Sequence, residues 1–85
     1  MNSSQPYSRR RLRVTADADP GALAKVVERF QNLNIVPRRI TAEFSSNDLL
    51  HIAVDVCGLA EEQLRLIVAK IRQAPCVTNA YWHRL

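Results

Sequence analysis

Apolar and polar residues alternate at the start of the chain and then recur at helical spacing. From Arg11 to Ala16 every second side chain is apolar, which is the period of a strand with one buried face. Beyond residues 19–21, the apolar side chains fall on one helical stripe: Leu23, Val26, Val27 and Phe30. The pattern predicts a strand followed by an amphipathic helix running to about Leu33, where Asn34 can take the left-handed conformation that ends many helices.

The break between this strand and this helix predicts where the helix starts. Pro20 fits a first helical turn, and Asp19 can accept hydrogen bonds from the free amides of that turn. Gly21 has no side chain, so an anion such as a carboxylate can approach the backbone amides closely. Two interpretations are open: a capped helix start with a tightly packed glycine, which is the more common one, and a ligand site.

The next stretch predicts two strands joined by a tight turn. Ile35–Phe44 is the second predicted strand, and Pro37 confines its early part to a sheet edge because proline donates no ladder hydrogen bond. Turn formers at residues 45–48 precede another alternating run, Leu50–Val56, which completes a hairpin. In the second strand we expect three residues to face inward: Ile40, Ala42 and Phe44. An edge strand of this kind can pair with another chain.

The last third of the chain predicts a helix and a final strand. The apolar stripe of this second helix consists of Leu64, Ile67, Val68 and Ile71. Pro75 prevents the helix from continuing, and Cys76–Arg84 is the last predicted strand.

The element order is therefore strand, helix, strand, strand, helix, strand. Two helices that each bury one stripe, together with right-handed crossovers, predict an α+β two-layer sandwich of ferredoxin-like βαββαβ topology. Its four-stranded antiparallel sheet has both helices on one face. The other face should be polar and should carry Arg11, Arg13, Thr15, Arg39, Thr41, Glu43, His51 and Asp55.

Length and composition indicate a single soluble domain. Of the 85 residues, we expect 1–9 to form a disordered polar tail and 10–85 one domain, small enough to gain from pairing with a second chain. The start of the chain lacks the apolar segment of a secretory signal and no apolar run is long enough for a membrane span, so we expect a cytoplasmic protein. Cys57 and Cys76 have no metal-ligand spacing and are expected to be buried free thiols.

The net charge of +4 arises largely from one cluster: Arg9, Arg10, Arg11 and Arg13. Such a cluster, with Arg38 and Arg39, can bind nucleic acid or an acidic partner, although a solvated strand end is the more common interpretation. RNA-recognition modules of this topology stack bases on aromatic residues of the two central strands. The outward positions here supply none, which disfavours nucleic acid.

Few residues are suited to catalysis, so we expect no catalytic residues, metal or cofactor. His51 lies on an outward strand face and His83 near the chain end, and neither is accompanied by a nucleophile. Asp17 and Asp19 share one loop and can hold an ammonium group, but a divalent metal normally requires more ligands than these two.

From Arg11 to Leu85 the chain resembles an ACT domain, the small ligand-sensing module of amino-acid metabolism. The resemblance rests on the strand Leu12–Ala16, the turn Asp19–Leu23, Phe30 late in the helix and the element order. Within that family it is similar to stand-alone small regulatory subunits of acetolactate synthase (acetohydroxyacid synthase), isozyme II type. The resemblance implies a non-catalytic regulatory subunit that forms a homodimer and binds a larger catalytic subunit.

The resemblance also implies an amino-acid effector, here a branched-chain amino acid, bound where two chains meet. Gly21 and Ala22 would hold the effector carboxylate and Leu23 would flank its side chain. The second chain would contribute three residues from the early part of its second strand: Ile35, Val36 and Pro37.

The sequence departs from the family pattern at Ala18, where effector-binding relatives commonly place Asn or Asp for the ammonium group. Two alternatives remain open. Either Asp17 or Asp19 takes over that role, or the domain binds an enzyme subunit without sensing an amino acid.

Overall fold

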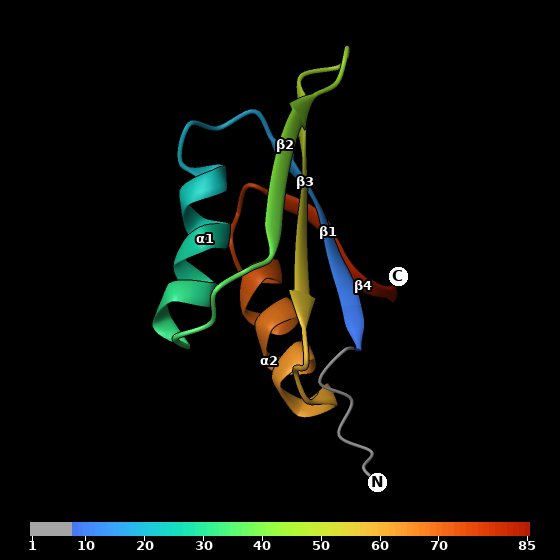
Figure 1. Cartoon of the computed structure of the whole chain (residues 1–85). Coiled ribbons are helices and arrows are strands. Elements are labelled where there is room, and N and C mark those ends of the chain that lie inside the picture. Colours follow the sequence, from blue (N-terminus) through green and yellow to red (C-terminus); the bar gives the residue numbers. More distant parts are fainter. Residues whose placement is uncertain (1–7) are drawn as a thin grey trace, which may run out of the picture.

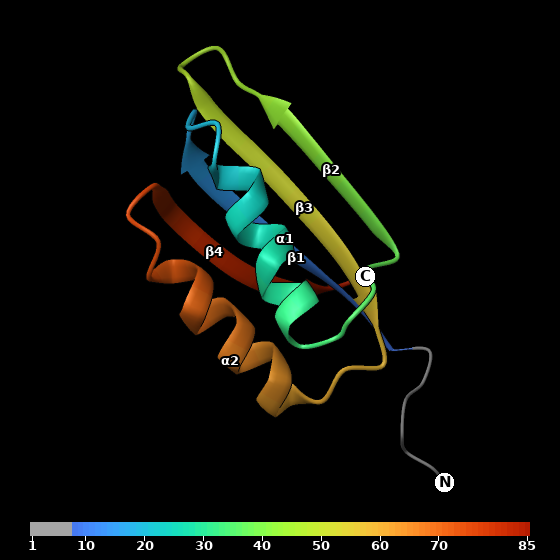
Figure 2. The same ribbon diagram turned by 90° about the vertical axis from the view of Figure 1, so that its left-hand side faces the viewer.

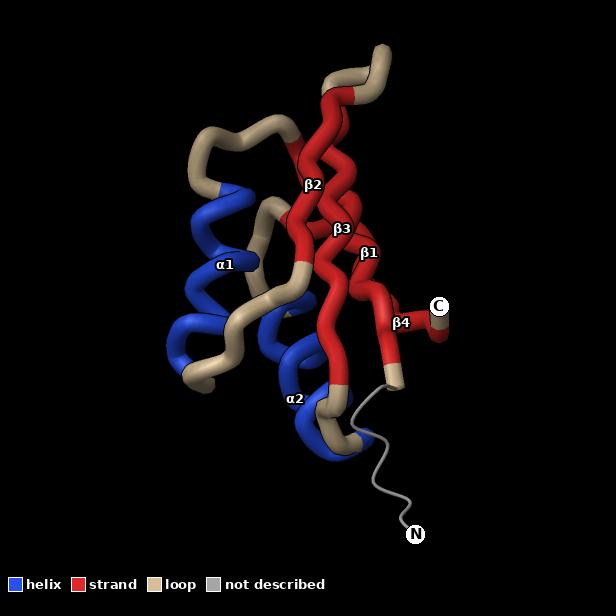
Figure 3. Tube along the Cα trace, viewed as in Figure 1, coloured by secondary structure: helices blue, strands red, loops and turns tan. Residues whose placement is uncertain are grey.

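The structure, a computed structural model, describes residues 8–85 and has two layers (Figure 1). The elements follow in the predicted order: β1 (Arg9–Asp17), α1 (Ala22–Asn32), β2 (Arg39–Phe44), β3 (Leu49–Cys57), α2 (Glu61–Arg72) and β4 (Val77–Arg84). Both helices lie on one side of the sheet and leave the other side open (Figure 3). The ferredoxin-like prediction is confirmed. β1 begins one residue before the predicted domain boundary, and most of the predicted tail, residues 1–7, lies outside the described residues.

The sheet is antiparallel, with strand order β2-β3-β1-β4, so β1 and β3 are central. In its register Leu12 lies opposite Val54 on β3 and Trp82 on β4. β1 and β2 therefore run in the same direction, and Asp17 and Phe44 lie at the same end of the sheet, opposite Leu49 and Leu50. This placement decides which loops lie near one another.

The core lies between the helices and the two central strands. Its largest fully buried side chains are Phe30, Leu12, Ile52, Ile67, Val14, Val26, Val54 and Val56. The α2 stripe is as predicted, with Val68 half-buried. At the β4 side, Trp82 closes the core by donating its indole N–H to the carbonyl of Leu64 at 2.7 Å. The alternating and helical patterns therefore correctly identified most of the buried faces.

α1 begins two residues later than the position of Pro20 predicted. Residues 19–22 first form a turn, in which the amide of Ala22 donates to the carbonyl of Asp19 at 2.9 Å. Helical bonding starts with Lys25 donating to Gly21, so Gly21 is the N-cap. At the other end Asn34 has φ 59°, the left-handed conformation expected there.

β2 is shorter than predicted, because it begins at Arg39 rather than Ile35. Arg38 makes the first backbone contact with β3 by donating to the carbonyl of Asp55 at 2.7 Å. Pro37, directly before it, has no N–H with which to extend the ladder. The residues from Ile35 to Pro37 form a connection between α1 and β2 instead.

An apolar strip beside β2 was predicted to be buried but is open to solvent. Ile40, Ala42 and Phe44 face the helix side of the sheet, yet all three are exposed, Phe44 to 74%. On α1, Leu23 and Val27 are each 37% exposed, while Ala22 is buried. The physical reason is visible in Figure 2, where α1 lies over the central strands and β2 extends beyond both helices. We call Leu23, Val27, Ile40 and Phe44 the β2-side strip.

The two cysteines differ in burial. Cys76 is buried, as predicted, whereas Cys57 is only half-buried because it lies at the end of β3 with its side chain on the open face of the sheet. No disulfide joins them.

Candidate functional site

The loop between β1 and α1 is held by backbone hydrogen bonds at the end of the central strand. The amide of Asp17 donates to the carbonyl of Cys76 at 2.8 Å, which ties the loop to the segment before β4. The amide of Asp19 donates to the carbonyl of Asp17 at 2.7 Å. Both aspartates are exposed. The loop therefore presents two carboxylates to solvent from a fixed backbone.

Asp19 already occupies two of the amides predicted to hold an effector carboxylate. Its Oδ1 accepts from the amide of Gly21 at 2.7 Å, and its carbonyl accepts from the amide of Ala22 at 2.9 Å. For Leu23 and Ala24, the structure of residues 8–85 contains no acceptor for the backbone N–H. The donors open to an anion are thus those of Leu23 and Ala24. The sequence pattern did not single out Ala24, because it does not reveal which amides a neighbouring aspartate takes.

Gly21 leaves room for an anion to approach these amides. Its backbone conformation does not require a glycine. Its φ of −87° and ψ of −5° are accessible to any residue. A Cβ placed there would meet only Oδ1 of Asp19, at 3.3 Å. The lack of a side chain therefore affects access more than folding.

The second half of the predicted site lies at the opposite end of α1 (Figure 1). Ile35 is tied to the end of that helix by donating its amide to the carbonyl of Phe30 at 2.9 Å. Val36 is 87% exposed, and Pro37 is half-buried beside it. Within one chain the structure does not bring residues 35–37 together with residues 17–23.

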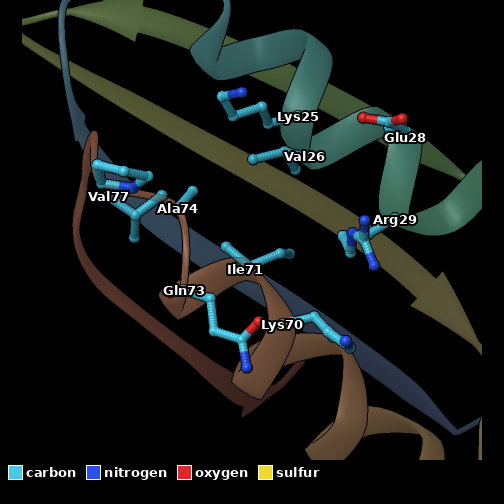
Figure 4. A pocket seen from close by; sticks show the side chains of 10 residues that line it. Lys25, Val26, Glu28, Arg29, Lys70, Ile71, Gln73, Ala74 and Val77 are labelled. Atoms are coloured by element: carbon cyan, nitrogen blue, oxygen red, sulfur yellow. The ribbon is translucent and has the colours of Figure 1, made fainter.

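A groove between α1 and α2 has a basic rim (Figure 4). Lys25 and Arg29 lie on α1, and Lys70 lies on α2 opposite them. This groove was not predicted from the sequence, although the spacing of four residues indicates that Lys25 and Arg29 share one side of the helix. The volume of the groove is about 260 Å³. The apolar side chains at its floor, Val26 and Ile71, are already buried, so a ligand there would cover little further apolar surface.

The open face of the sheet carries the polar set predicted for it. β1 places Arg9, Arg11 and Arg13 on this face and β2 places Arg39 there. Arg10 departs from the predicted cluster, because the alternation of the strand turns it to the helix side. There it pairs with Glu61 at the start of α2.

Arg11 and Asp55 form a two-point ion pair on this face. The Arg11 Nε donates to Oδ1 at 2.6 Å and its Nη2 donates to Oδ2 at 2.9 Å. These hydrogen bonds are the main reason that the pKa of Asp55 lies below its ordinary value, and the positive charges of Arg11, Arg39 and Arg9 lower it further. The hydrogen bond to Asp55 likewise raises the pKa of Arg11.

Asp55→Asn is expected to lower the free energy of unfolding at neutral pH by about 1 kcal/mol or less, because the pair is partly solvated. The pKa of Asp55 is lower in the folded chain than in the unfolded one. Its charge therefore favours folding above the unfolded pKa of about 3.9 and ceases to do so as the pH falls through the folded value. Urea unfolding at neutral pH and at a pH well below the unfolded pKa should show a gap between wild type and variant that narrows at the lower pH. Glu62→Gln on α2 is the control, and a gap of equal size at both pH values would contradict the assignment.

Among residues 8–85 there is no group of three or more His, Cys, Asp or Glu side chains arranged to hold a metal ion. In the same part of the chain, neither helix has the length and apolar character to cross a bilayer.

A βαββαβ sandwich with both helices on one face of a four-stranded antiparallel sheet is the ferredoxin-like fold, which hosts many unrelated functions. The chain belongs to the family of ACT-like domains, which it matches over residues 3–85. No curated protein matches the sequence.

Solved structures share the fold at low sequence identity. The C-terminal domain of the MgtC protein from Mycobacterium tuberculosis has a TM-score of 0.77 and 19% identity, over 99% of this chain and 94% of that one. The ACT domain from GTP pyrophosphokinase of Chlorobium tepidum has a TM-score of 0.75 and 11% identity, over 88% and 96%. A homoserine dehydrogenase from Thiobacillus denitrificans has a TM-score of 0.76 and 20% identity, over 92% of this chain and 17% of the enzyme. These likenesses establish the fold alone.

Proposed function

We propose that the chain is a non-catalytic regulatory subunit that forms a homodimer and modulates an amino-acid biosynthetic enzyme. Acetolactate synthase is the enzyme we propose, with a branched-chain amino acid as effector at the dimer interface. The observation that carries the proposal is the position of the two half-sites at opposite ends of α1, beside an edge strand.

Antiparallel pairing of two β2 edges would join these half-sites. β2 lies at the edge of the sheet, and its end at Phe44 is level with the end of β1 at Asp17. If two copies pair about a twofold axis, the start of one β2 lies beside the end of the other. Residues 35–37 of one chain then approach residues 17–23 of its partner. A site that is divided within the monomer would become continuous in the dimer.

The β2-side strip supports the same arrangement. Leu23, Val27, Ile40 and Phe44 are apolar and exposed on the side of the molecule where a second copy would pair. Covering them would remove apolar surface from water, which favours association at about 25 cal/mol per Å². Hydrogen bonds between the two edges would give the pairing its register.

The loop has the chemistry to hold an amino-acid zwitterion. The open amides of Leu23 and Ala24 suit a carboxylate at the positive end of the α1 dipole. The carboxylates of Asp17 and Asp19 suit the ammonium group, the role that relatives give to the position of Ala18. Leu23 and Val36 would flank an apolar side chain. Because Asp19 engages the amide of Gly21, its carboxylate is fixed close to the helix start.

Regulation would follow from differential binding. An effector that bridges two chains binds one dimer arrangement better than another. The effector can shift the conformational equilibrium of the bound enzyme by no more than that difference in affinity. No catalytic role is needed for any residue of the chain.

Calorimetric titration with valine, leucine and isoleucine, beside sedimentation, tests this function. We expect a dimer that binds one of them at millimolar concentration or below, and Gly21→Val to weaken binding about tenfold or more by shielding the amides of the helix start. Gly21→Ala is the matched smaller step: its Cβ would meet only Oδ1 of Asp19, at 3.3 Å, so it should cost about 1 kcal/mol of stability or less and weaken binding less than Gly21→Val does. Undiminished affinity in folded Gly21→Val would refute the site. A dimer that binds none of the three amino acids would refute effector sensing.

A further inference from the structure

The open face of the sheet carries a row of charged side chains that runs across all four strands. The register places Arg39, Asp55, Arg11 and His83 side by side, one from each strand. Neither α1 nor α2 covers this face, as Figures 1 and 3 show. The row is therefore available to a partner.

Positive charge exceeds negative charge on this face. Four arginines project from it, Arg9, Arg11, Arg13 and Arg39, against three carboxylates, Asp17, Glu43 and Asp55. Asp55 is already engaged at two points by Arg11, while Arg9 and Arg39 are drawn to that same carboxylate. Bringing these guanidinium groups together costs electrostatic energy unless an external anion neutralises them.

An open hollow of about 840 Å³ lies where these arginines meet. It is lined by Arg9, Arg11, Arg38, Arg39, Asp55, Val56, Cys57 and Leu85. It opens broadly to solvent, whereas sites that bury a small ligand are usually enclosed clefts. Its breadth suits an extended partner that contacts several guanidinium groups at once.

Arg13 extends the basic surface toward β4. Its Nε donates to Nε2 of His83 at 3.1 Å, and Nδ1 of His83 lies 3.0 Å from the carbonyl of Arg84. Because Nε2 accepts from Arg13, the imidazole proton lies on Nδ1 and is donated to that carbonyl. His83 thus holds Arg13 in place without neutralising it.

We propose that the open face binds an acidic polypeptide segment of the partner protein, through Arg9, Arg13, Arg38 and Arg39. Arginine forks recognise carboxylates with defined geometry, and arginine clusters recur where acidic motifs are bound. Residues four apart in an extended chain lie about 14 Å apart, which is also the separation of Arg9 and Arg13 along β1. The proposal deepens the proposed function, on which it rests, by naming the surface through which the regulatory chain meets its partner.

A nucleic acid fits this face less well. Single strands are bound by stacking bases on aromatic side chains, and the outward positions of the central strands β1 and β3 hold no Phe, Tyr or Trp, only His51 near one end. Tyr81 lies on the edge strand β4, next to His83. A base stacked on Tyr81 would lie beside Arg13 but would be separated from Arg39 on β2 by both central strands.

The experiment uses the full chain and a labelled peptide with glutamate at every second position and serine between. We expect saturable binding in fluorescence anisotropy at low salt that weakens as salt is added. Arg39→Gln and Arg13→Gln should each weaken it about three- to fivefold. Arg65→Gln, which removes the same charge from an exposed position on α2, should change it less than twofold. Thermal unfolding of each variant verifies the fold.

Each other outcome overturns the proposal. Equal weakening by Arg65→Gln would show an attraction to net charge rather than to this face. Tighter binding of a single-stranded oligonucleotide of matched charge would assign the face to nucleic acid. Absence of peptide binding at low salt would remove the docking surface. Dimerisation and amino-acid binding are measured separately on the same protein, so a failure here is distinct from a failure of the effector site.

Discussion

The double variant Ile40→Lys/Phe44→Lys is expected to be a monomer at concentrations at which the wild type is a dimer. Both side chains belong to the β2-side strip and are exposed, Ile40 to 37% and Phe44 to 74%. In an antiparallel β2 pairing each lysine would lie close to lysines of the second copy, in place of an apolar contact. Loss of apolar burial and like-charge repulsion should together weaken the dimer about a hundredfold or more.

Sedimentation velocity and titration with branched-chain amino acids are the measurements for this variant. If the site is shared between two chains, the monomer should lose effector binding even though residues 17–24 are unchanged. Leu66→Lys is the matched control, because Leu66 is an exposed apolar residue on α2, away from β2. A variant that stays dimeric would show that the chains pair through another surface. A monomer that still binds the effector would show that one chain supplies the whole site.

The fold of the variant monomer should be preserved. Neither side chain is part of the buried core, and exposed substitutions usually change the free energy of unfolding by about 0.5 kcal/mol or less. A normal circular dichroism spectrum would therefore separate a failure to associate from a failure to fold.

The periodicity of the sequence predicted the element order and most of the core because each central element buries a regular face. Alternation in β1 and β3 and the helical stripe of α2 correspond to residues that are buried in the structure. The same reasoning placed Ile40, Ala42 and Phe44 on the correct side of the sheet but wrongly predicted their burial. Alternation gives the direction of a side chain. Its burial depends on whether another element reaches over it, which only the packing of α1 determines.

The loop that precedes α1 was predictable from the sequence in its position and less so in its hydrogen bonds. The Asp-Pro-Gly segment correctly marked a helix start, but the use of the Gly21 and Ala22 amides by Asp19 depends on turn geometry that residue types do not specify. The sequence alone could have predicted that the arginine cluster is divided between the two faces of the sheet. Strict alternation along β1 already requires Arg10 to face away from Arg9 and Arg11.

Phe30→Ala is expected to remove about 3–5 kcal/mol from the free energy of unfolding. Phe30 is 1% exposed, and it is the largest fully buried side chain of the core that joins α1 to the sheet. A domain of this size has a total stability of about 4–13 kcal/mol, so this one substitution should remove between about a quarter and all of it.

Urea unfolding followed by the fluorescence of Trp82 measures the effect of Phe30→Ala, because Trp82 packs against the same core and is fixed by its hydrogen bond to Leu64. The titration is best made in the Ile40→Lys/Phe44→Lys background, where the stability should not depend on protein concentration. Phe30→Leu, which retains most of the apolar volume, should cost about 1.5 kcal/mol or less. A loss below about 1 kcal/mol in Phe30→Ala would contradict the packing described for α1. α1 also carries the open amides of Leu23 and Ala24, so Phe30→Ala in the otherwise wild-type, dimeric chain should weaken effector binding in proportion to the fraction of chains that unfold.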